Sequence, residues 1–485
     1  MTSSTAKCDL PRKARDSLEK AYADRIRVNS DLDRSLVSFQ RNKEEPFYRW
    51  FKYKEGFSSR LVQYLLATVE KAGVVLDPFA GAGAALFASR DMGWNAIGIE
   101  LLPVGVFAME ARLAAEEIDK RMFAKAVAQA EGVDFARHFA DGETFTHLGI
   151  TQGAFPDDTE REILGFLAYC DRRIRDRNVR RLFRFACFSE LEDVSYTRKD
   201  GQYLRWDARS SRRRGARPFD KGIIAPFHHA VISKLRAIEH DIDGGNRSSI
   251  LFAQDKVKRG TLDVRRGSCL RILPTIADSS VDLVITSPPY CNRYDYTRTY
   301  ALELAFLGYD DREVKALRQE MLSCTVENRE KVGELREYYG GLGLGMRFRE
   351  IEEVFQSQEA LWEVLESLGH YRALGMLNNN NIPRMVRNYF YEMCFVTCEL
   401  ARLLRAGGSI FMVNDNVRYA GEAVPVDLIL SEFAKAFGLD VGVIWTLPRG
   451  KGNSSQQMGA YGRDEIRKCV YAWSKPYAKQ GKEGR

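Results

Sequence analysis

Short apolar runs alternate with helix-patterned segments in three separate parts of the chain. Residues 74–100 read as an apolar strand, a glycine-rich turn, an alanine-rich helix and a second strand ending at Glu100, which is the order of a βαβ unit. The rhythm resumes in 256–290 with strand, turn, short helix and strand, and returns after 385 with helix, strand, helix and two further strands. This alternation predicts an α/β protein with a doubly wound, Rossmann-like sheet.

Two long segments interrupt the rhythm, and both read as mainly helical insertions. They divide the chain into an N-terminal helical arm (1–40), the half of the core with the glycine-rich turn (41–120), a basic helical insertion (121–255), a core segment (256–290), a second helical insertion (291–385) and the C-terminal strands of the core (386–485).

Two finer predictions concern element ends. The helix that begins near Leu61 is expected to stop at Gly73, because glycine is common at helix C-caps. The strands 440–447 and 468–473 are expected to pair antiparallel at the sheet edge, with the first of them parallel to the central strands. The loop 448–463 would then lie at the carboxyl ends of the central strands, where doubly wound sheets bind ligands.

The composition is that of an ordinary soluble globular protein, with 45% hydrophobic and 29% charged residues. No apolar run approaches the roughly 18 residues of a membrane span, and the first residues lack the apolar region of a secretory signal. The nine cysteines are scattered without paired metal-ligand spacing. This pattern predicts reduced thiols in a cytoplasmic protein and no metal site.

Positive charge is concentrated in one part of the first insertion. Residues 172–217 hold fifteen Arg or Lys and six Asp or Glu, whereas the whole chain has a net charge of +7. Such a run is usually a solvated surface. Phe183, Phe185, Tyr203 and Trp206 interleave with the arginines, which favours a surface that follows nucleic-acid phosphates. The candidate phosphate contacts are Arg212, Arg213 and Arg214.

The first motif is "LDPFAGAG". It ends a strand at Asp77 and enters a helix through Gly81 and Gly83, where glycine lets the backbone turn sharply and approach a ligand. Glu100, at the end of the next strand, is placed to accept both hydroxyls of a ribose. The spacing is neither that of a GxGxxG turn nor that of a Walker A lysine loop, so the motif favours another adenosine-containing cofactor.

The second motif follows the apolar strand 281–286. Pro288 and Pro289 cannot continue a strand, so Ser287 to Tyr290 would form a rigid, extended tetrapeptide. Such a tetrapeptide holds a hydroxyl, backbone carbonyls and an aromatic face in fixed directions around a planar ligand. The alternative is an ordinary strand stop in which Tyr290 caps the core. The strands ending at Asp77 and at residue 286 are expected to be neighbours, which would unite both motifs in one crevice.

Together the two motifs resemble those of S-adenosylmethionine-dependent amino-methyltransferases that act on DNA, over roughly residues 45–115 and 256–475. The resemblance implies a methyltransferase sheet, and it implies catalytic roles for Ser287, Pro288, Pro289 and Tyr290. The cofactor would be held by Asp77, Pro78, Phe79, Ala80, Gly81, Gly83, Glu100 and Ser268. The family often has an acidic residue where this chain has Ser268.

The resemblance has further implications. The segment 50–59 would form an additional cofactor wall, and 121–255 would recognise the target. An aspartate in place of Gly83 would occupy cofactor space. The Ser287 oxygen and the Pro288 carbonyl would accept hydrogen bonds from the amine of a flipped base, on which Tyr290 would stack.

Serine as the first residue of the catalytic motif resembles the cytosine-N4 group, and adenine N6 remains the second choice of target. An RNA or protein amino-methyltransferase, or a catalytically silent DNA-binding subunit, also remains open. The implied partners are double-stranded DNA and a cognate restriction endonuclease. Further candidate DNA contacts lie in the loop 448–463: Lys451, Asn453, Gln456, Gln457 and Arg463.

Overall fold

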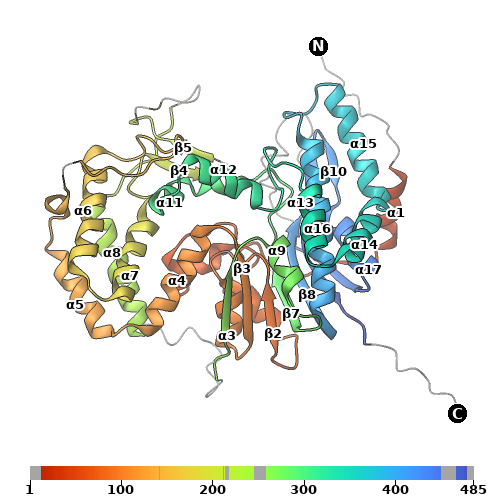
Figure 1. Ribbon diagram of the computed structural model, residues 1–485, viewed down its shortest axis with the longest axis horizontal. Coiled ribbons are helices and arrows are strands. Elements are labelled where there is room, and N and C mark those ends of the chain that lie inside the picture. Colours follow the sequence, from red (N-terminus) through yellow and green to blue (C-terminus); the bar gives the residue numbers. More distant parts are fainter. Residues whose placement is uncertain are drawn as a thin grey trace.

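A computed structural model of the protein describes residues 12–140, 142–201, 203–210, 212, 218–244, 258–448 and 466–477. Its centre is an eight-stranded sheet (Figure 1) in which all neighbouring strands are parallel except at β12, which is antiparallel to both neighbours. The predicted α/β sheet is therefore confirmed. In spatial order the strands are β1 (Ile26–Val28), β11 (Asp440–Thr446), β12 (Lys468–Ser474), β8 (Leu404–Asp415), β7 (Val281–Thr286), β2 (Val74–Asp77), β3 (Asn95–Glu100) and β6 (Leu262–Arg266).

Helices cover both faces of the sheet, because side chains along a strand alternate between the faces. In β7, Leu283 and Ile285 are buried together with Leu61 and Leu65 of one helical layer, whereas Val284 is buried with the layer on the opposite face. The first layer contains α2 (Ser59–Leu66) and α3 (Ala84–Asp91). The opposite layer contains α9 (Cys269–Ile272), α16 (Ile382–Leu403) and α17 (Val426–Ala436).

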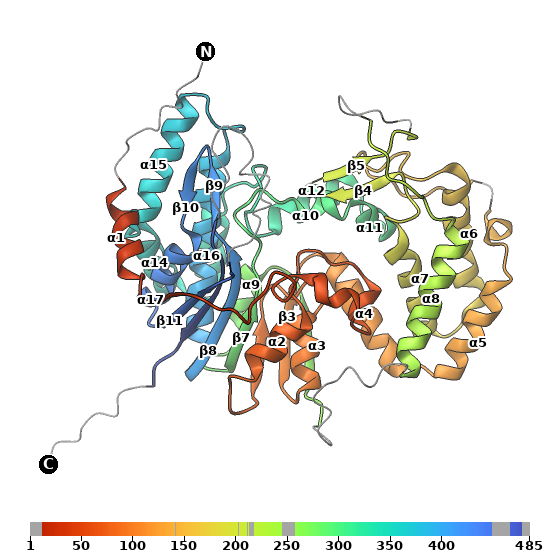
Figure 2. The same ribbon diagram turned by 180° about the vertical axis from the view of Figure 1, so that it is seen from behind.

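A first helical lobe lies on one side of the sheet (Figures 1 and 2) and has its own apolar core, in which Phe166, Phe183 and Phe185 are buried. Part of the second insertion joins this core. The lobe comprises α4 (Pro103–Glu117), α5 (Lys120–Glu131), η3 (Phe135–His138), α6 (Asp157–Arg173), α7 (Arg177–Glu190), the hairpin β4 (Thr197–Asp200) and β5 (Tyr203–Trp206), α8 (Phe227–Asp243), α10 (Tyr296–Thr299), α11 (Ala301–Phe306) and α12 (Asp311–Glu320).

A second lobe lies on the other side of the sheet (Figures 1 and 2) and packs against α16. The N-terminal helix joins it through Arg15, which is buried and pairs with Glu363 and Glu422. The lobe comprises α1 (Lys13–Ala21), α13 (Val332–Gly341), α14 (Gly345–Gln356), α15 (Glu359–Ala373) and the hairpin β9 (Val417–Tyr419) and β10 (Glu422–Val424). Across the described residues, the helices are all too short or too polar to cross a membrane.

Two expectations about element ends are wrong in part. The second helix ends at Leu66 rather than at Gly73. Gly73 is instead a place of close approach: a Cβ there would collide with the carboxylate of Asp282, which accepts a hydrogen bond from the Val74 amide at 2.7 Å. Strands β11 and β12 do pair antiparallel, and β11 is parallel to the central strands, but β1 from the N-terminal arm forms the sheet edge beyond them.

Two of the four aromatic residues of the basic run lie in the core rather than on the expected surface, whereas Trp206 is half-buried and has the guanidinium of Arg212 over its ring. Phe183 and Phe185 are on the inner face of α7 and are at most 1% exposed. Their spacing among arginines therefore reflects an amphipathic helix, with the aromatic side chains in the core and the basic ones outside.

Candidate functional site

The two motifs meet at the carboxyl ends of neighbouring strands. β2 pairs with β7 in parallel register, with Val75 opposite Leu283 and Leu76 opposite Val284, so the predicted adjacency is confirmed. Thr286 Oγ1 donates a hydrogen bond of 2.6 Å to Asp77 Oδ1. This buried bond joins the last residues of the two strands directly, and the sequence did not predict it.

Asp77 is a buried carboxyl at the start of the glycine-rich turn. Its Oδ1 also accepts a hydrogen bond from the Phe79 amide at 3.0 Å, so the side chain fixes the backbone that follows. Burial raises the pKa of Asp77 to about 7, although the bonds from Thr286 and Phe79 act in the opposite direction.

Gly81 and Gly83 both have positive φ, +55° and +84°, but they face different surroundings. A Cβ on Gly81 would come within 2.8 Å of Tyr53 Cε1, beside the cavity. A Cβ on Gly83 would instead meet Phe87 and Met109 in the core beneath the turn. The expectation that an aspartate at Gly83 would enter cofactor space is therefore wrong: the side chain would meet packed apolar groups.

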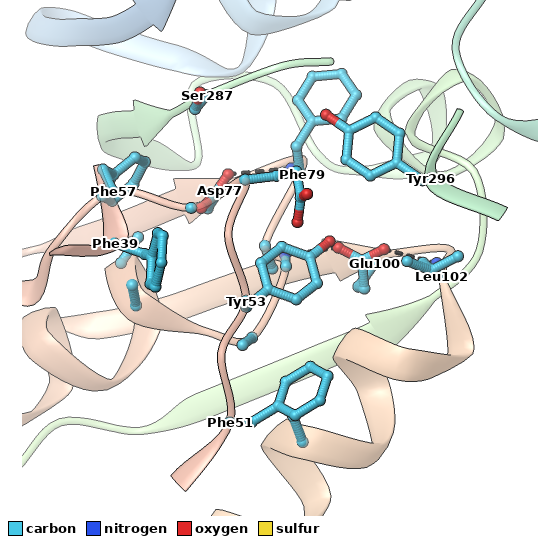
Figure 3. A pocket seen from close by; sticks show the side chains of 18 of the residues that line it. Phe39, Phe51, Tyr53, Phe57, Asp77, Phe79, Glu100, Leu102, Ser287 and Tyr296 are labelled. Atoms are coloured by element: carbon cyan, nitrogen blue, oxygen red, sulfur yellow. Dashed lines mark hydrogen bonds between the residues drawn. The ribbon is translucent and has the colours of Figure 1, made fainter. Parts of the chain in front are cut away.

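Glu100 is tied to the same turn. Its Oε2 accepts a hydrogen bond from the Gly81 amide and its Oε1 one from the Leu102 amide, each at 2.6 Å. Burial is the main cause that raises the pKa of Glu100 to about 7, and the charge of Asp77 adds to it. Figure 3 shows the Tyr53 ring pointing toward this carboxylate, with Phe79 and Tyr296 farther along the cavity.

A single cavity of about 280 Å³ connects the two motifs (Figure 3). Of the residues expected to hold the cofactor or perform catalysis, those that line it are Asp77, Pro78, Phe79, Ala80, Gly81, Glu100, Ser268, Ser287 and Pro289. Gly83, Pro288 and Tyr290 are not in the lining. Residues 50–57 of the expected wall line it with the exception of Lys54. Residues that the sequence did not point to also line it, among them Phe39, Arg112, Tyr296, Met321 and Leu322.

The catalytic motif directly follows β7. Pro288 and Pro289 are buried, and Ser287 Oγ donates to the Tyr290 hydroxyl at 3.4 Å. Burial is the main cause of the raised pKa of Tyr290, so this hydroxyl stays protonated at neutral pH. The next residue, Cys291, is fully buried, and its carbonyl accepts a hydrogen bond from the Tyr419 hydroxyl at 2.6 Å, which is a packing arrangement.

The wall before β2 is bonded to the segment after the catalytic motif. Glu55 accepts hydrogen bonds from the hydroxyls of Tyr294 and Tyr300. The ring of Tyr53 stacks on that of Tyr300, with 5.3 Å between centroids and 12° between planes. The only sequence signal for this cluster was the high density of tyrosines in 290–300.

Ser268 lies at the N-terminus of α9, and its Oγ donates to the Glu320 carbonyl at 3.3 Å. Arg212 donates to the Gly149 carbonyl at 2.6 Å, and its guanidinium lies 5.1 Å from the centroid of the Trp206 ring. The other candidate DNA contacts are outside the described residues: Arg213, Arg214, Lys451, Asn453, Gln456, Gln457 and Arg463.

The donor set at the glycine-rich end fits an adenosine-type cofactor. Gly81 has no side chain where the backbone borders the cavity, and a Cβ there would fill the space beside Tyr53. Each Glu100 oxygen accepts one amide, and a carboxylate oxygen has a second lone pair, so both oxygens can also accept from a diol. Residues Asp77, Gly81 and Glu100 could therefore hold such a group.

Comparison with known proteins identifies the family of the chain. The Type II methyltransferase M.AvaI of Nostoc sp. (strain PCC 7120) is 45% identical over 463 residues, which are 95% of this chain and 93% of the relative. The Type II methyltransferase M.BsoBI of Geobacillus stearothermophilus is 39% identical over 481 residues, 96% of this chain and 93% of the relative. No protein-family model and no solved structure matches the chain. At this identity over nearly the whole length, the chain belongs to the Type II methyltransferases.

Proposed function

We propose that this protein is a site-specific DNA methyltransferase that transfers the methyl group of S-adenosylmethionine to the exocyclic amine of a flipped base, cytosine N4 in particular. The observation that carries the proposal is the buried bond between Thr286 and Asp77, next to the single cavity that both motifs line. It holds a turn suited to adenosine and a tetrapeptide suited to a planar amine side by side.

At the cofactor end, Glu100 accepts the ribose hydroxyls, and Gly81 allows the backbone to approach the cofactor closely. Phe79 and Pro78 supply apolar surface, and Ser268 borders the adenine side. When bound, the cofactor supplies an electrophilic methyl group on a sulfonium. Asp77 and Glu100 both line the cavity, and a positively charged group held there would favour their ionised forms.

At the catalytic end, the target nitrogen is a weak nucleophile because its lone pair is delocalised into the base. The Ser287 oxygen and the Pro288 carbonyl accept its two N–H groups and turn the lone pair toward the methyl group. The two consecutive prolines, Pro288 and Pro289, keep these acceptors fixed. Tyr290 stacks on the flipped base. Positioning for in-line displacement supplies most of the acceleration, and no covalent intermediate is required.

Serine in the first position of the motif supports cytosine N4 as the target, by resemblance to that group. Adenine N6 is the second candidate, because the same cavity and acceptors suit its amine. Two partners follow: double-stranded DNA and a cognate restriction endonuclease, both in the cytoplasm. Arg212, Arg213 and Arg214 of the 121–255 insertion, and the amides and basic residues of the loop 448–463, are proposed to contact the DNA.

Chromatography of nucleosides tests the proposal. DNA is methylated by the purified protein with a labelled cofactor and digested, and N4-methylcytosine is separated from N6-methyladenine. We expect the label in N4-methylcytosine. Label in N6-methyladenine would establish the second candidate, whereas label in RNA but not in DNA would refute the DNA assignment. A protein that binds no cofactor and transfers no methyl group would be a silent subunit.

A further inference from the structure

A polar cluster lies just beyond the catalytic motif, outside the cavity lining. Arg293 follows Tyr290 by three positions and has a φ of +68°, a conformation that residues other than glycine rarely adopt. A tight turn places it there: the Asn292 amide donates to the Tyr290 carbonyl at 2.7 Å, and the Tyr294 amide donates to Asn292 Oδ1 at 3.1 Å. Backbone in such a region is typical of functional sites.

The Arg293 side chain contacts a loop from a distant part of the sequence. Its Nη1 donates to Asn378 Oδ1 at 2.8 Å. Its Nε is buried and has no hydrogen-bond partner among the residues that the structure describes. A guanidinium has five N–H donors, so Arg293 retains donors that its described surroundings do not use.

The contacted loop consists of four consecutive asparagines, Asn378 to Asn381, between α15 and α16. Three of them, Asn378, Asn380 and Asn381, are exposed. An asparagine amide offers a donor and an acceptor side by side, which matches the edge of adenine, as the fork of arginine matches guanine.

The topology puts this loop at the catalytic edge of the sheet. α16 ends at Leu403 and β8 starts at the next residue, so the 22-residue helix runs back along the sheet and begins near the carboxyl ends of the strands. A contact confirms this direction: Asn414, near the end of β8, donates to the hydroxyl of Tyr389 in the second turn of α16, at 2.9 Å.

Charge distinguishes this loop from the basic insertion. Residues 332–381, which contain α13 to α15 and the loop, include four basic and eight acidic residues, so their net charge is −4. A surface of this sign does not attract phosphates. The uncharged amides and one arginine at its catalytic edge suit contacts with base edges, which carry sequence information that phosphates lack.

We propose that Arg293 and the asparagine loop (Asn378 to Asn381) form a base-reading element that contacts bases beside the flipped nucleotide. This inference rests on the proposed DNA methylation. It places part of the sequence recognition in the second lobe, opposite the basic insertion. Arg293 and the exposed amides contact base edges, while the left-handed turn after Tyr290 fixes Arg293 relative to the catalytic motif.

The test begins with the wild-type protein. Sequencing modified bases in DNA from cells that express it defines the recognition sequence, and a wild type that modifies no DNA would overturn both proposals. Single-turnover methylation is then measured on the cognate duplex and on duplexes with one base pair replaced. The variants are Arg293→Ala, Arg293→Lys and Asn380→Ala, with Arg349→Ala, an exposed arginine of α14, as the matched control.

We expect Arg293→Ala and Arg293→Lys to lose about 10- to 100-fold of the discrimination at one or two positions next to the target base, the range for a bidentate base contact. Lysine keeps the positive charge but lacks the forked guanidinium. A loss of discrimination in Arg293→Lys would therefore show that base reading, and not charge alone, requires the arginine. Asn380→Ala should lose discrimination at one position without changing the salt dependence of DNA binding. The discrimination of Arg349→Ala should match that of wild type. The cofactor affinities of all the variants, measured by calorimetry, should also match wild type.

Discrimination within twofold of wild type at every position, in both Arg293→Ala and Asn380→Ala, would show that the cluster only packs. Asn380 is exposed and has no side-chain hydrogen bond to other described residues, so its variant is expected to fold and decides the matter if Arg293→Ala does not fold.

Discussion

The two ends of the cavity are built from opposite kinds of chemistry. The cofactor end has two buried carboxyls, Asp77 and Glu100, each held by backbone amides of the glycine-rich turn. The catalytic end is lined by Ser287 and Pro289, neither of which carries a charge. One end is therefore suited to hydroxyls and positive charge, and the other to an uncharged planar group.

This difference shows how one crevice can separate binding from chemistry. Carboxyls whose pKa is about 7 respond to an approaching cation, whereas a rigid, neutral wall has only to aim a nucleophile. Variants at the cofactor end should change affinity, and variants at the catalytic end should change rate. The Thr286–Asp77 bond links the two ends, so changes there should affect both.

The largest effect is expected at the catalytic end. Ser287→Ala removes an acceptor for the amine, and Tyr290→Ala removes the stacking face, so each should lower the single-turnover rate on DNA by about 10²- to 10³-fold, as for other preorganised hydrogen-bonding groups. The cofactor affinity should stay within twofold of wild type. Rapid-quench kinetics and calorimetry measure the two quantities separately. A variant with the full wild-type rate would show that its residue has no catalytic role.

A matched pair of glycine variants distinguishes the cavity from the core beneath it. Gly81→Ala and Gly83→Ala impose the same left-handed strain, but only the first puts a methyl group beside Tyr53 in the cavity. We expect Gly81→Ala to weaken cofactor binding by about 100-fold, within the range of backbone strain plus a close contact. Gly83→Ala should lower the melting temperature and leave the affinity of the folded protein nearly unchanged. Equal losses of cofactor affinity in Gly81→Ala and Gly83→Ala would show that the two glycines do not differ in their relation to the cavity.

The charge at the cofactor end predicts a pH dependence of stability. Burial raises the pKa of Glu100 from 4.5 to about 7, so between these values the folded protein holds a proton that the unfolded chain has released. The free energy of unfolding therefore falls as pH rises through this window, by on the order of 3 kcal/mol, and is level above it.

Glu100→Gln has no proton to exchange, so its stability relative to wild type should rise across the same window. Asp77 remains in both proteins, so the difference reports Glu100 together with its interaction with the charge of Asp77. Urea unfolding between pH 4.5 and 8 measures it. Parallel stability curves for the two proteins would show that Glu100 titrates normally.

The smallest effect is expected at the link. Thr286→Val removes the donor to Asp77 Oδ1 and should lower the free energy of unfolding by about 1–3 kcal/mol. Cofactor affinity and transfer rate should fall together, because both ends depend on the position of Asp77. Thr286→Ser retains the hydroxyl and serves as the control. Unchanged stability in Thr286→Val would mean that the bond does not hold the two strands together.

Much of this arrangement could be predicted from local patterns. The βαβ order placed Glu100 at a strand end, and alternation of strands with helices made the strands of Asp77 and residue 286 neighbours. These inferences succeeded because period-2 and period-3.6 patterns and glycine turns are set by residues close in sequence.

The remainder depends on contacts between distant segments. Glu55 meets Tyr300, 245 positions away, and nothing in either segment indicates the other. Gly83 carries the same sequence signal as Gly81, and only the packing of Phe87 and Met109 separates their roles. The second insertion is likewise divided between two lobes, because its apolar helical faces are covered by different neighbours.

The most direct test of the central claim compares cells that express the wild-type protein with cells that express Ser287→Ala. Sequencing that detects modified bases in their DNA shows whether the cavity joining Asp77 to Ser287 transfers a methyl group to DNA. We predict methylated cytosines at one recurring sequence in the wild-type cells and none above background with Ser287→Ala, at equal protein levels. Unmodified DNA in the wild-type cells, or equal modification by the variant, would contradict the account.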